Sequence, residues 1–145
     1  MTQLYLYMRL VRAKLFIDEH YASDLDLDNI ADEAFFSKFH FIRLFRRVFG
    51  YTPHRYLTAV RLDRARALLR EGLPVSSICY SVGFDSLSSF TGLFKRATGK
   101  TPSAFRLEAL RLRADMARTP LAYIPHCFAQ NRNFQEVSLA AAPLL

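Results

Sequence analysis

The chain repeats part of its own sequence, and no other feature limits its possible folds as strongly. Residues 37–57, SKFHFIRLFRRVFGYTPHRYL, align with residues 86–106, SLSSFTGLFKRATGKTPSAFR, at a shift of 49 residues. Eight of the 21 aligned positions are identical, including the first serine, a Leu-Phe pair, a glycine and a Thr-Pro pair. A repeat of this length indicates one supersecondary unit that the chain uses twice.

Each copy has the sequence of a helix with a capping residue at both ends. Ser37 and Ser86 can accept hydrogen bonds from the first N–H groups of a helix, and Gly50 and Gly99 can adopt the left-handed conformation that ends one. The Thr-Pro pair that follows predicts the start of another helix, because threonine is a fair cap and proline fits the first helical position.

These caps and the helical spacing of apolar residues predict an all-α protein. In each unit a short helix precedes the capped helix. This is the order of a helix-turn-helix, whose second helix can enter the major groove of DNA. We expect seven helices, over residues 4–21, 27–34, 38–49, 53–71, 75–82, 86–98 and 102–116.

The long helix between the copies predicts a seven-helix module with two helix-turn-helix subdomains. We expect the first subdomain at residues 1–50, a linker helix at 51–71, the second subdomain at 72–116 and a C-terminal tail at 117–145. The apolar, proline-interrupted run from Leu121 to Phe128 leaves packing on the second subdomain, docking on a partner and disorder open for this tail.

The charges of the chain are segregated. The formal net charge is +7. Residues 15–33 hold seven acids and no lysine or arginine, whereas residues 37–70 hold nine bases against one acid, Asp63. A positive field of this kind raises the rate of encounter with polyanions, so nucleic acid or an anionic lipid surface is the expected class of partner.

The apolar residues of each capped helix lie on one stripe. In the first copy, Phe41, Leu44, Phe45 and Val48 follow the i, i+3, i+4, i+7 pattern of a buried helix face, so all four are expected in the core. The second copy keeps this stripe as Phe90, Leu93, Phe94 and Ala97.

The opposite face of the first capped helix is basic and carries an aromatic residue. A solvated face with an incidental phenylalanine is one interpretation. The other is DNA contact, because arginine can donate two hydrogen bonds to guanine and an apolar side chain can rest on a thymine methyl. The positive charge of Lys38 is unfavourable near a helix start, where the helix dipole is also positive, and a nearby phosphate would offset this repulsion. We expect Phe39 and Arg43 to face bases, and Lys38, Arg46 and Arg47 to face the DNA backbone.

The same face of the second copy has fewer residues that could read bases. Gly92 stands where the first copy has Arg43, and a glycine in mid-helix costs about 1 kcal/mol relative to alanine. We infer that the first unit specifies the DNA sequence. The second unit is expected mostly to grip the DNA backbone, through Lys95, Arg96 and Lys100.

The pattern of motif residues resembles the DNA-binding module of the AraC/XylS transcriptional regulators over about residues 4–113. The resemblance rests on residues in both copies and in the helix between them. They are Ser37, His40-Phe41, Arg43-Leu44-Phe45, Gly50, Thr52-Pro53, Tyr56-Leu57, Arg61-Leu62, Ala65, Leu68-Leu69, Ile78, Gly83-Phe84, Phe90, Phe94-Lys95, Gly99 and Thr101-Pro102.

The resemblance implies a ligand, partners and site residues. It implies that helices 38–49 and 86–98 of a single chain enter adjacent major grooves on one face of double-stranded DNA. One helical turn, about 34 Å, would separate them. It also implies contact with RNA polymerase during activation. The implied base-reading residues are Phe39, Ile42 and Arg43 in the first unit and Leu87, Ser88 and Thr91, beside Gly92, in the second.

The chain departs from the family pattern in two respects. The turn Ala34-Phe35-Phe36 stands where many relatives place glycine. Most members also carry a separate effector-binding domain, for which 145 residues leave no room. The resemblance is therefore to the small stand-alone regulators whose activity follows their abundance, and neither a cofactor nor the sensing of a small molecule is expected.

Metal sites are not predicted. Cys79 and Cys127 lack the spacing of a zinc site or a disulfide framework, and they suit a reducing bacterial cytoplasm. The stretch DLDLDNIADEAF begins like a calcium loop but lacks the required glycine and glutamate. Its Asp26 and Asp28 are expected to cap the second helix instead. Cys79 is expected in the core.

Enzymatic and membrane functions are also disfavoured. The sequence has no glycine-rich phosphate loop, nucleophile elbow or convergent acid–base pair, so we do not expect an enzyme. No run of eighteen uncharged apolar residues occurs, so a soluble, unexported protein is expected. The alternatives to a sequence-specific regulator are a basic amphipathic helix on a membrane surface, which does not explain the duplication, and a nonspecific nucleic-acid binder.

Overall fold

The computed structural model describes residues 2–119 and contains only helices within that range. The predicted all-α fold is confirmed, and each observed helix begins and ends within two residues of its predicted range. The helices are α1 (Gln3–His20), α2 (Leu27–Glu33), α3 (Lys38–Phe49), α4 (Pro53–Glu71), α5 (Val75–Ser81), α6 (Leu87–Thr98) and α7 (Pro102–Arg118). The prediction for the C-terminal tail, residues 117–145, concerns a segment that lies largely outside the described residues.

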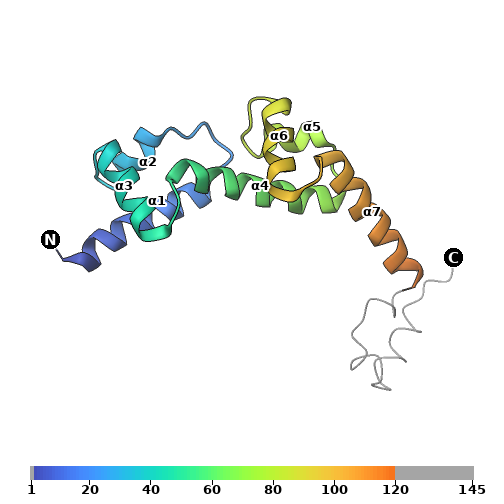
Figure 1. Ribbon diagram of the computed structural model, residues 1–145, viewed down its shortest axis with the longest axis horizontal. Coiled ribbons are helices and arrows are strands. Elements are labelled where there is room, and N and C mark those ends of the chain that lie inside the picture. The colour runs from blue at the N-terminus through green and yellow to red at the C-terminus, as the bar shows by residue number, and fades with distance from the viewer. Residues whose placement is uncertain (1, 120–145) are drawn as a thin grey trace, which may run out of the picture.

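The helices form two lobes arranged along α4 (Figure 1). In the first lobe α1, α2 and α3 pack on one another, and α1 and α3 also pack on α4. In the second lobe α5 and α6 pack on its second half, and α7 lies against α4.

Each lobe has its own hydrophobic core, built from the repeated phenylalanines. Phe41 and Phe45 are fully buried in the first lobe, with ring centroids 5.5 Å apart. Phe90 and Phe94 are fully buried in the second lobe, with centroids 5.7 Å apart. The helix α4 contributes to both cores: Leu57 to the first, and Leu62, Ala65 and Leu69 to the second.

The last position of each apolar stripe is not buried, which corrects the prediction. Val48 is 42% exposed, and Ala97, its counterpart, is also exposed. Both lie in the last turn of their helix, beside an open groove between that helix and the first helix of its own repeat. Leu44 and Leu93, one turn earlier, are half-buried and pack against the cores.

The capping predictions hold at most helix ends. Thr52 and Thr101 each accept a hydrogen bond from a backbone N–H three residues later, at 3.3 Å. Gly50 and Gly99 have φ values of 83° and 78°. Ser37 is the exception: it occupies the cap position, but its hydroxyl accepts no capping hydrogen bond. Asp26 caps α2 as expected, because its carboxylate accepts the N–H of Asp28 at 3.2 Å.

The structural repeat is longer than the repeat found in the sequence. It includes the helix that precedes each helix-turn-helix, at a shift of 52 residues: the pattern Arg-Leu-x-x-Ala recurs at 9–13 and 61–65. Leu10, Ala13 and Ile17 of α1 are buried, and so are their counterparts Leu62, Ala65 and Leu69 of α4. Thus the first half of α4 belongs to the core of the first lobe, and its second half is the first helix of the second repeat.

The turns between the paired helices both contain a residue in the left-handed region of φ. Phe35 has φ = 55° and Gly83, its counterpart, has φ = 96°. In each turn the next N–H bonds a carbonyl five residues back: Phe36 to Ala31 at 3.0 Å, and Phe84 to Cys79 at 3.1 Å. The departure at Ala34-Phe35-Phe36 therefore changes the side chain and keeps the turn.

Candidate nucleic-acid interface

The outer face of α3 is exposed, with the residue types predicted for it. Phe39 is 79% exposed, and Arg43, Arg46 and Arg47 are also exposed. Within residues 2–119 these three guanidinium groups have no carboxylate at ion-pair distance. Ile42, at the edge of this face, is half-buried. The first lobe thus presents unneutralised positive charge beside an uncovered aromatic ring.

Lys38 lies in a different environment from the one expected. Its Nζ is 3.1 Å from Oδ2 of Asp28 in α2. The carboxylate offsets the unfavourable position of an ammonium group at a helix start, so no external phosphate is needed for that purpose. Lys100, at the end of the second unit, is likewise paired, with Glu108 of α7.

The outer face of α6 is exposed but carries less positive charge than that of α3. Ser88, Lys95 and Arg96 are exposed, Leu87 is 41% exposed, and Thr91 is half-buried. Gly92 lies in the middle of this face, and a Cβ atom there would meet nothing within 4 Å. The space that Arg43 fills in the first unit is therefore open in the second.

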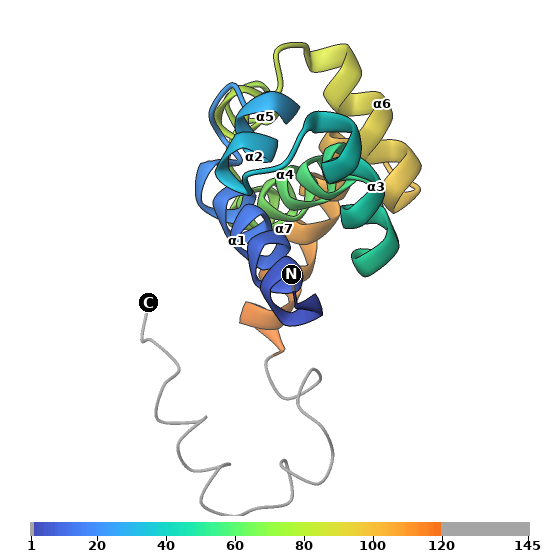
Figure 2. The same ribbon diagram turned by 90° about the vertical axis from the view of Figure 1, so that its left-hand side faces the viewer.

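The two outer helices lie in separate lobes and on a common side. Figure 1 places α3 and α6 at different points along α4. Viewed along the long axis, both lie on the same side of α4 (Figure 2). They are not buried against each other, so a single extended ligand could contact both.

A junction around Arg61 links the lobes, and the sequence interpretation did not identify it. Its Nε donates to the carbonyl of Tyr21 at 2.7 Å, and its Nη2 donates to the carbonyl of Ser23 at 2.9 Å. The same guanidinium lies 5.8 Å from the ring centroid of Phe84 in the second lobe. Burial lowers the pKa of Arg61, against the opposing effect of nearby carboxylates. One signal was present in the sequence, the recurrence of Arg-Leu-x-x-Ala.

Close packing reinforces this junction. The ring of Tyr21 packs against both hydrophobic cores, and Arg64 lies 5.5 Å from its centroid. A Cβ atom on Gly83 would lie 2.8 Å from the carbonyl oxygen of Tyr21 and 2.9 Å from Nε of Arg61. The second turn therefore requires glycine for two reasons: its left-handed backbone and the approach of the first lobe.

The first turn is held by an arginine from the equivalent helix position. Arg9 of α1 donates from Nε to the carbonyl of Ala34 at 2.6 Å and from Nη2 to the carbonyl of Phe35. Its guanidinium lies 3.9 Å from the ring centroid of Phe36. Arg9 and Arg61 thus occupy equivalent positions, but Arg9 closes its own lobe whereas Arg61 binds the other one.

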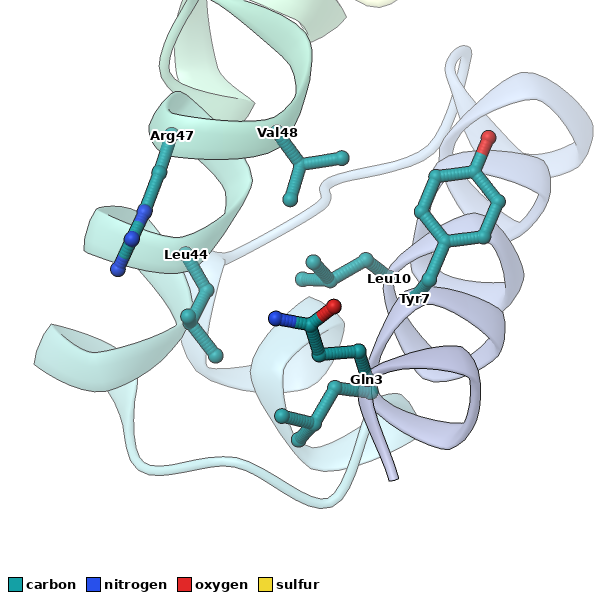
Figure 3. Close-up of a pocket in the computed structure, with 7 residues that line it drawn as sticks. Gln3, Tyr7, Leu10, Leu44, Arg47 and Val48 are labelled. Atoms are coloured by element: carbon teal, nitrogen blue, oxygen red, sulfur yellow. The ribbon is translucent and has the colours of Figure 1, made fainter. Parts of the chain in front are cut away.

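An open groove of about 420 Å³ lies beside the outer face of α3 (Figure 3). Leu44 of α3 faces Gln3 and Leu10 of α1 across it, and Tyr7 lies on the α1 side. Its lining is mostly apolar, with Arg47 and Val48 on the α3 side.

Other predicted features can be placed in the described range. Cys79 is buried, as expected, and burial followed by the charge of Asp85 raises the pKa of its thiol. None of the helices within residues 2–119 combines the length and apolar character that crossing a membrane requires.

Comparison with known proteins places these features in a family. Residues 30–108 match the family model described as a helix-turn-helix domain. The chain is 34% identical over 93 residues to the Right origin-binding protein of Escherichia coli (strain K12), covering 63% of this chain and 32% of that protein. It is 33% identical over 92 residues to the "Probable transcriptional regulator LumQ" of Photobacterium leiognathi, covering 63% and 37%. The chain thus spans about a third of the length of these curated relatives.

A solved structure shares the fold. The chain resembles the DNA-binding domain of AdpA, described as a global transcriptional factor and solved in complex with a target DNA. The TM-score is 0.65 at 29% sequence identity, covering 77% of this chain and 96% of that one.

Proposed function

Because the chain belongs to the AraC/XylS family of helix-turn-helix proteins, we propose that it is a sequence-specific, double-stranded-DNA-binding transcriptional regulator. The observation that carries this proposal is the pair of exposed helices, α3 and α6, on one side of the molecule. The three arginines of α3, which form no ion pair within residues 2–119, supply the charge that a phosphate backbone attracts. The similar fold of AdpA, solved with its target DNA, supports the same ligand.

The first reading helix is α3, inserted into one major groove. Phe39, Ile42 and Arg43 read bases. Arg43 can donate two parallel hydrogen bonds to guanine, and the exposed ring of Phe39 can rest on a thymine methyl. Discrimination by a bidentate contact is about 1–3 kcal/mol per base pair. Arg46 and Arg47, which have no carboxylate at ion-pair distance within residues 2–119, contact the DNA backbone.

The second reading helix is α6, inserted into the adjacent major groove. Leu87, Ser88 and Thr91 face bases but offer no bidentate donor, so this helix contributes less specificity. Lys95 and Arg96 contact the backbone. Lys38 and Lys100 also face the backbone in this proposal, but each would have to exchange an internal carboxylate for a phosphate. We therefore expect Lys38 and Lys100 to contribute less to DNA affinity than the cations without an ion pair in the described residues.

The remaining parts of the proposal concern organisation and partners. The two separate cores support a first subdomain at residues 1–50 and a second at 72–116, with 51–71 as the linker helix. One chain with two heads can bind DNA as a monomer. RNA polymerase is the proposed protein partner, the bacterial nucleoid the proposed location, and no enzymatic activity is proposed.

The test is selection of binding sites from random duplexes, followed by titration at several salt concentrations. The logarithm of affinity should fall linearly with the logarithm of salt. Arg43→Ala should weaken binding and relax base preference at one position. Lys95→Ala should weaken all sequences alike and reduce the salt slope by about 1.

Two results would contradict parts of this proposal. Identical behaviour of the Arg43→Ala and Lys95→Ala chains would refute the division of labour between the heads. Strong binding to anionic liposomes without affinity for any duplex would favour the membrane-surface alternative, and DNA binding with no preferred site would favour a nonspecific binder.

A further inference from the structure

The groove beside α3 has a counterpart between the two lobes. This second groove, which we call the inter-head groove, has a volume of about 400 Å³ and lies between the first half of α4 and α6. Each residue that lines the first groove has an equivalent in the second. The equivalent residue lies 52 positions later for α1 and 49 positions later for α3. The inter-head groove is lined by Arg55, Thr58, Ala59 and Leu62 of α4 and by Leu93, Arg96 and Ala97 of α6, with His54 in addition.

The two grooves differ in charge. Gln3 of the first groove is replaced by Arg55 in the second, and the apolar Leu6 by Thr58. Arg55 and Arg96 are both exposed. No acidic residue lines the inter-head groove, and neither guanidinium has an ion-pair partner in the described part of the chain.

The start of α4 adds to the positive potential of the inter-head groove. The helix has 19 residues with proline at its first position, and His54 and Arg55 follow directly. The helix dipole is positive at this end, whereas Pro53 has no N–H and the N–H of Arg55 already bonds Oγ1 of Thr52. Arg55 and Arg96 therefore line one groove beside the start of α4, and no acidic side chain lines it within the described residues.

The two arginines come from different lobes. The start of α4 is fixed to the first lobe, because the Tyr56 hydroxyl donates to Oδ1 of Asp18 in α1 at 2.6 Å. Arg96 belongs to α6 of the second lobe. A ligand that contacts both arginines therefore bridges the two heads.

We propose that the inter-head groove is a phosphate-binding site for the DNA strand that runs between the two major-groove segments, with Arg55 as its principal contact and His54 as a further donor. This inference rests on the proposed function, since the groove lies between the start of α4, which follows directly on α3, and α6. When both helices occupy adjacent major grooves, the backbone of the intervening segment passes between them. The first groove lies beyond α3 and has no equivalent position between heads.

The experiment compares Arg55→Ala with Arg111→Ala in the full chain. Arg111 is an exposed arginine of α7 with no carboxylate partner among the described residues, so this control removes the same charge away from the groove. Affinity for the selected duplex is measured from low to moderate salt. Loss of one phosphate contact should reduce the salt slope by about 0.9 in the Arg55→Ala chain and leave it unchanged in the Arg111→Ala chain.

A duplex with one uncharged backbone linkage shows which phosphate Arg55 contacts. Single methylphosphonates are placed either between the two major-groove segments or at the duplex ends. A neutral linkage between the segments should weaken the wild-type and Arg111→Ala chains equally and weaken the Arg55→Ala chain clearly less, because its principal contact is already lost.

The outcomes separate the two proposals. Equal salt slopes for the two variants, in chains that bind the selected duplex, would overturn the phosphate site alone. Equal sensitivity of all three chains to the central methylphosphonate would do the same. Absence of duplex binding by the wild-type chain would overturn the proposed function and this site with it.

Discussion

Phe35 and Gly83 occupy equivalent turns with the same left-handed backbone and different side chains. A left-handed conformation costs a residue with a Cβ atom about 1–2 kcal/mol, and glycine avoids that cost. Phe35 is 72% exposed, and Arg9 bonds the carbonyls of the turn. Gly83 lies against the backbone of Tyr21. One turn thus tolerates a side chain and the other excludes it.

Substitutions at these two turns should have opposite effects on stability. Phe35→Gly should raise the free energy of unfolding by up to about 1 kcal/mol, because it relieves the backbone and gives up little buried area. Gly83→Ala should lower the free energy of unfolding by about 2 kcal/mol or more, because strain adds to a clash with a backbone oxygen. Urea unfolding measures both, and changes of the same sign would refute the assignment.

At the scale of the element, α3 and α6 share a buried stripe and differ on the outer face. The difference centres on Gly92, which is exposed in mid-helix with open space around it. A glycine there weakens α6 without any packing reason in the described structure. An α6 with few side chains that could read bases and a strongly charged α3 are consistent with the proposed division between the heads.

Gly92→Ala should therefore stabilise the chain. The expected gain in free energy of unfolding is about 1 kcal/mol, the difference in helix propensity between the two residues. Ser89→Ala, also exposed on α6, is the matched control and should gain about half as much. Thermal unfolding of both chains provides the measurement. A loss of stability on Gly92→Ala would mean that this backbone needs glycine.

At the scale of the whole molecule, the relative position of the heads depends on more than α4. Arg61 donates to two carbonyls of the first lobe while its guanidinium faces Phe84 of the second. Tyr21 packs against both cores at the same point. We expect the junction to restrain the angle between α3 and α6, on which binding to two adjacent grooves would depend.

Arg61→Met should loosen this junction while keeping an apolar stem in place. The loss of two hydrogen bonds should lower the free energy of unfolding by about 1–2 kcal/mol. Affinity for the selected duplex should fall, and the penalty for inserting or deleting one base pair between the half-sites should shrink. Arg111→Met serves as the control for charge. An unchanged dependence on half-site spacing would show that α4 alone sets the geometry.

The sequence by itself determined the helices, most of their caps and the use of one unit twice. These features depend on local backbone hydrogen bonding and on a periodicity of 3.6 residues. Both are determined by residues that are close together in the sequence. The exposure of Phe39 and Arg43 followed from the same periodicity. The assignment of individual residues to bases or phosphates remains a prediction.

Only the tertiary structure decided what covers each helix face and which charges meet. Val48 and Ala97 follow the buried pattern but lie beside a groove, because burial depends on where a neighbouring helix packs. Lys38 and Lys100 have carboxylate partners from other elements, which no spacing along a single helix could predict. The junction at Arg61 joins residues 40 positions apart in sequence, because the folded chain, not the local helix, brings Tyr21 to it.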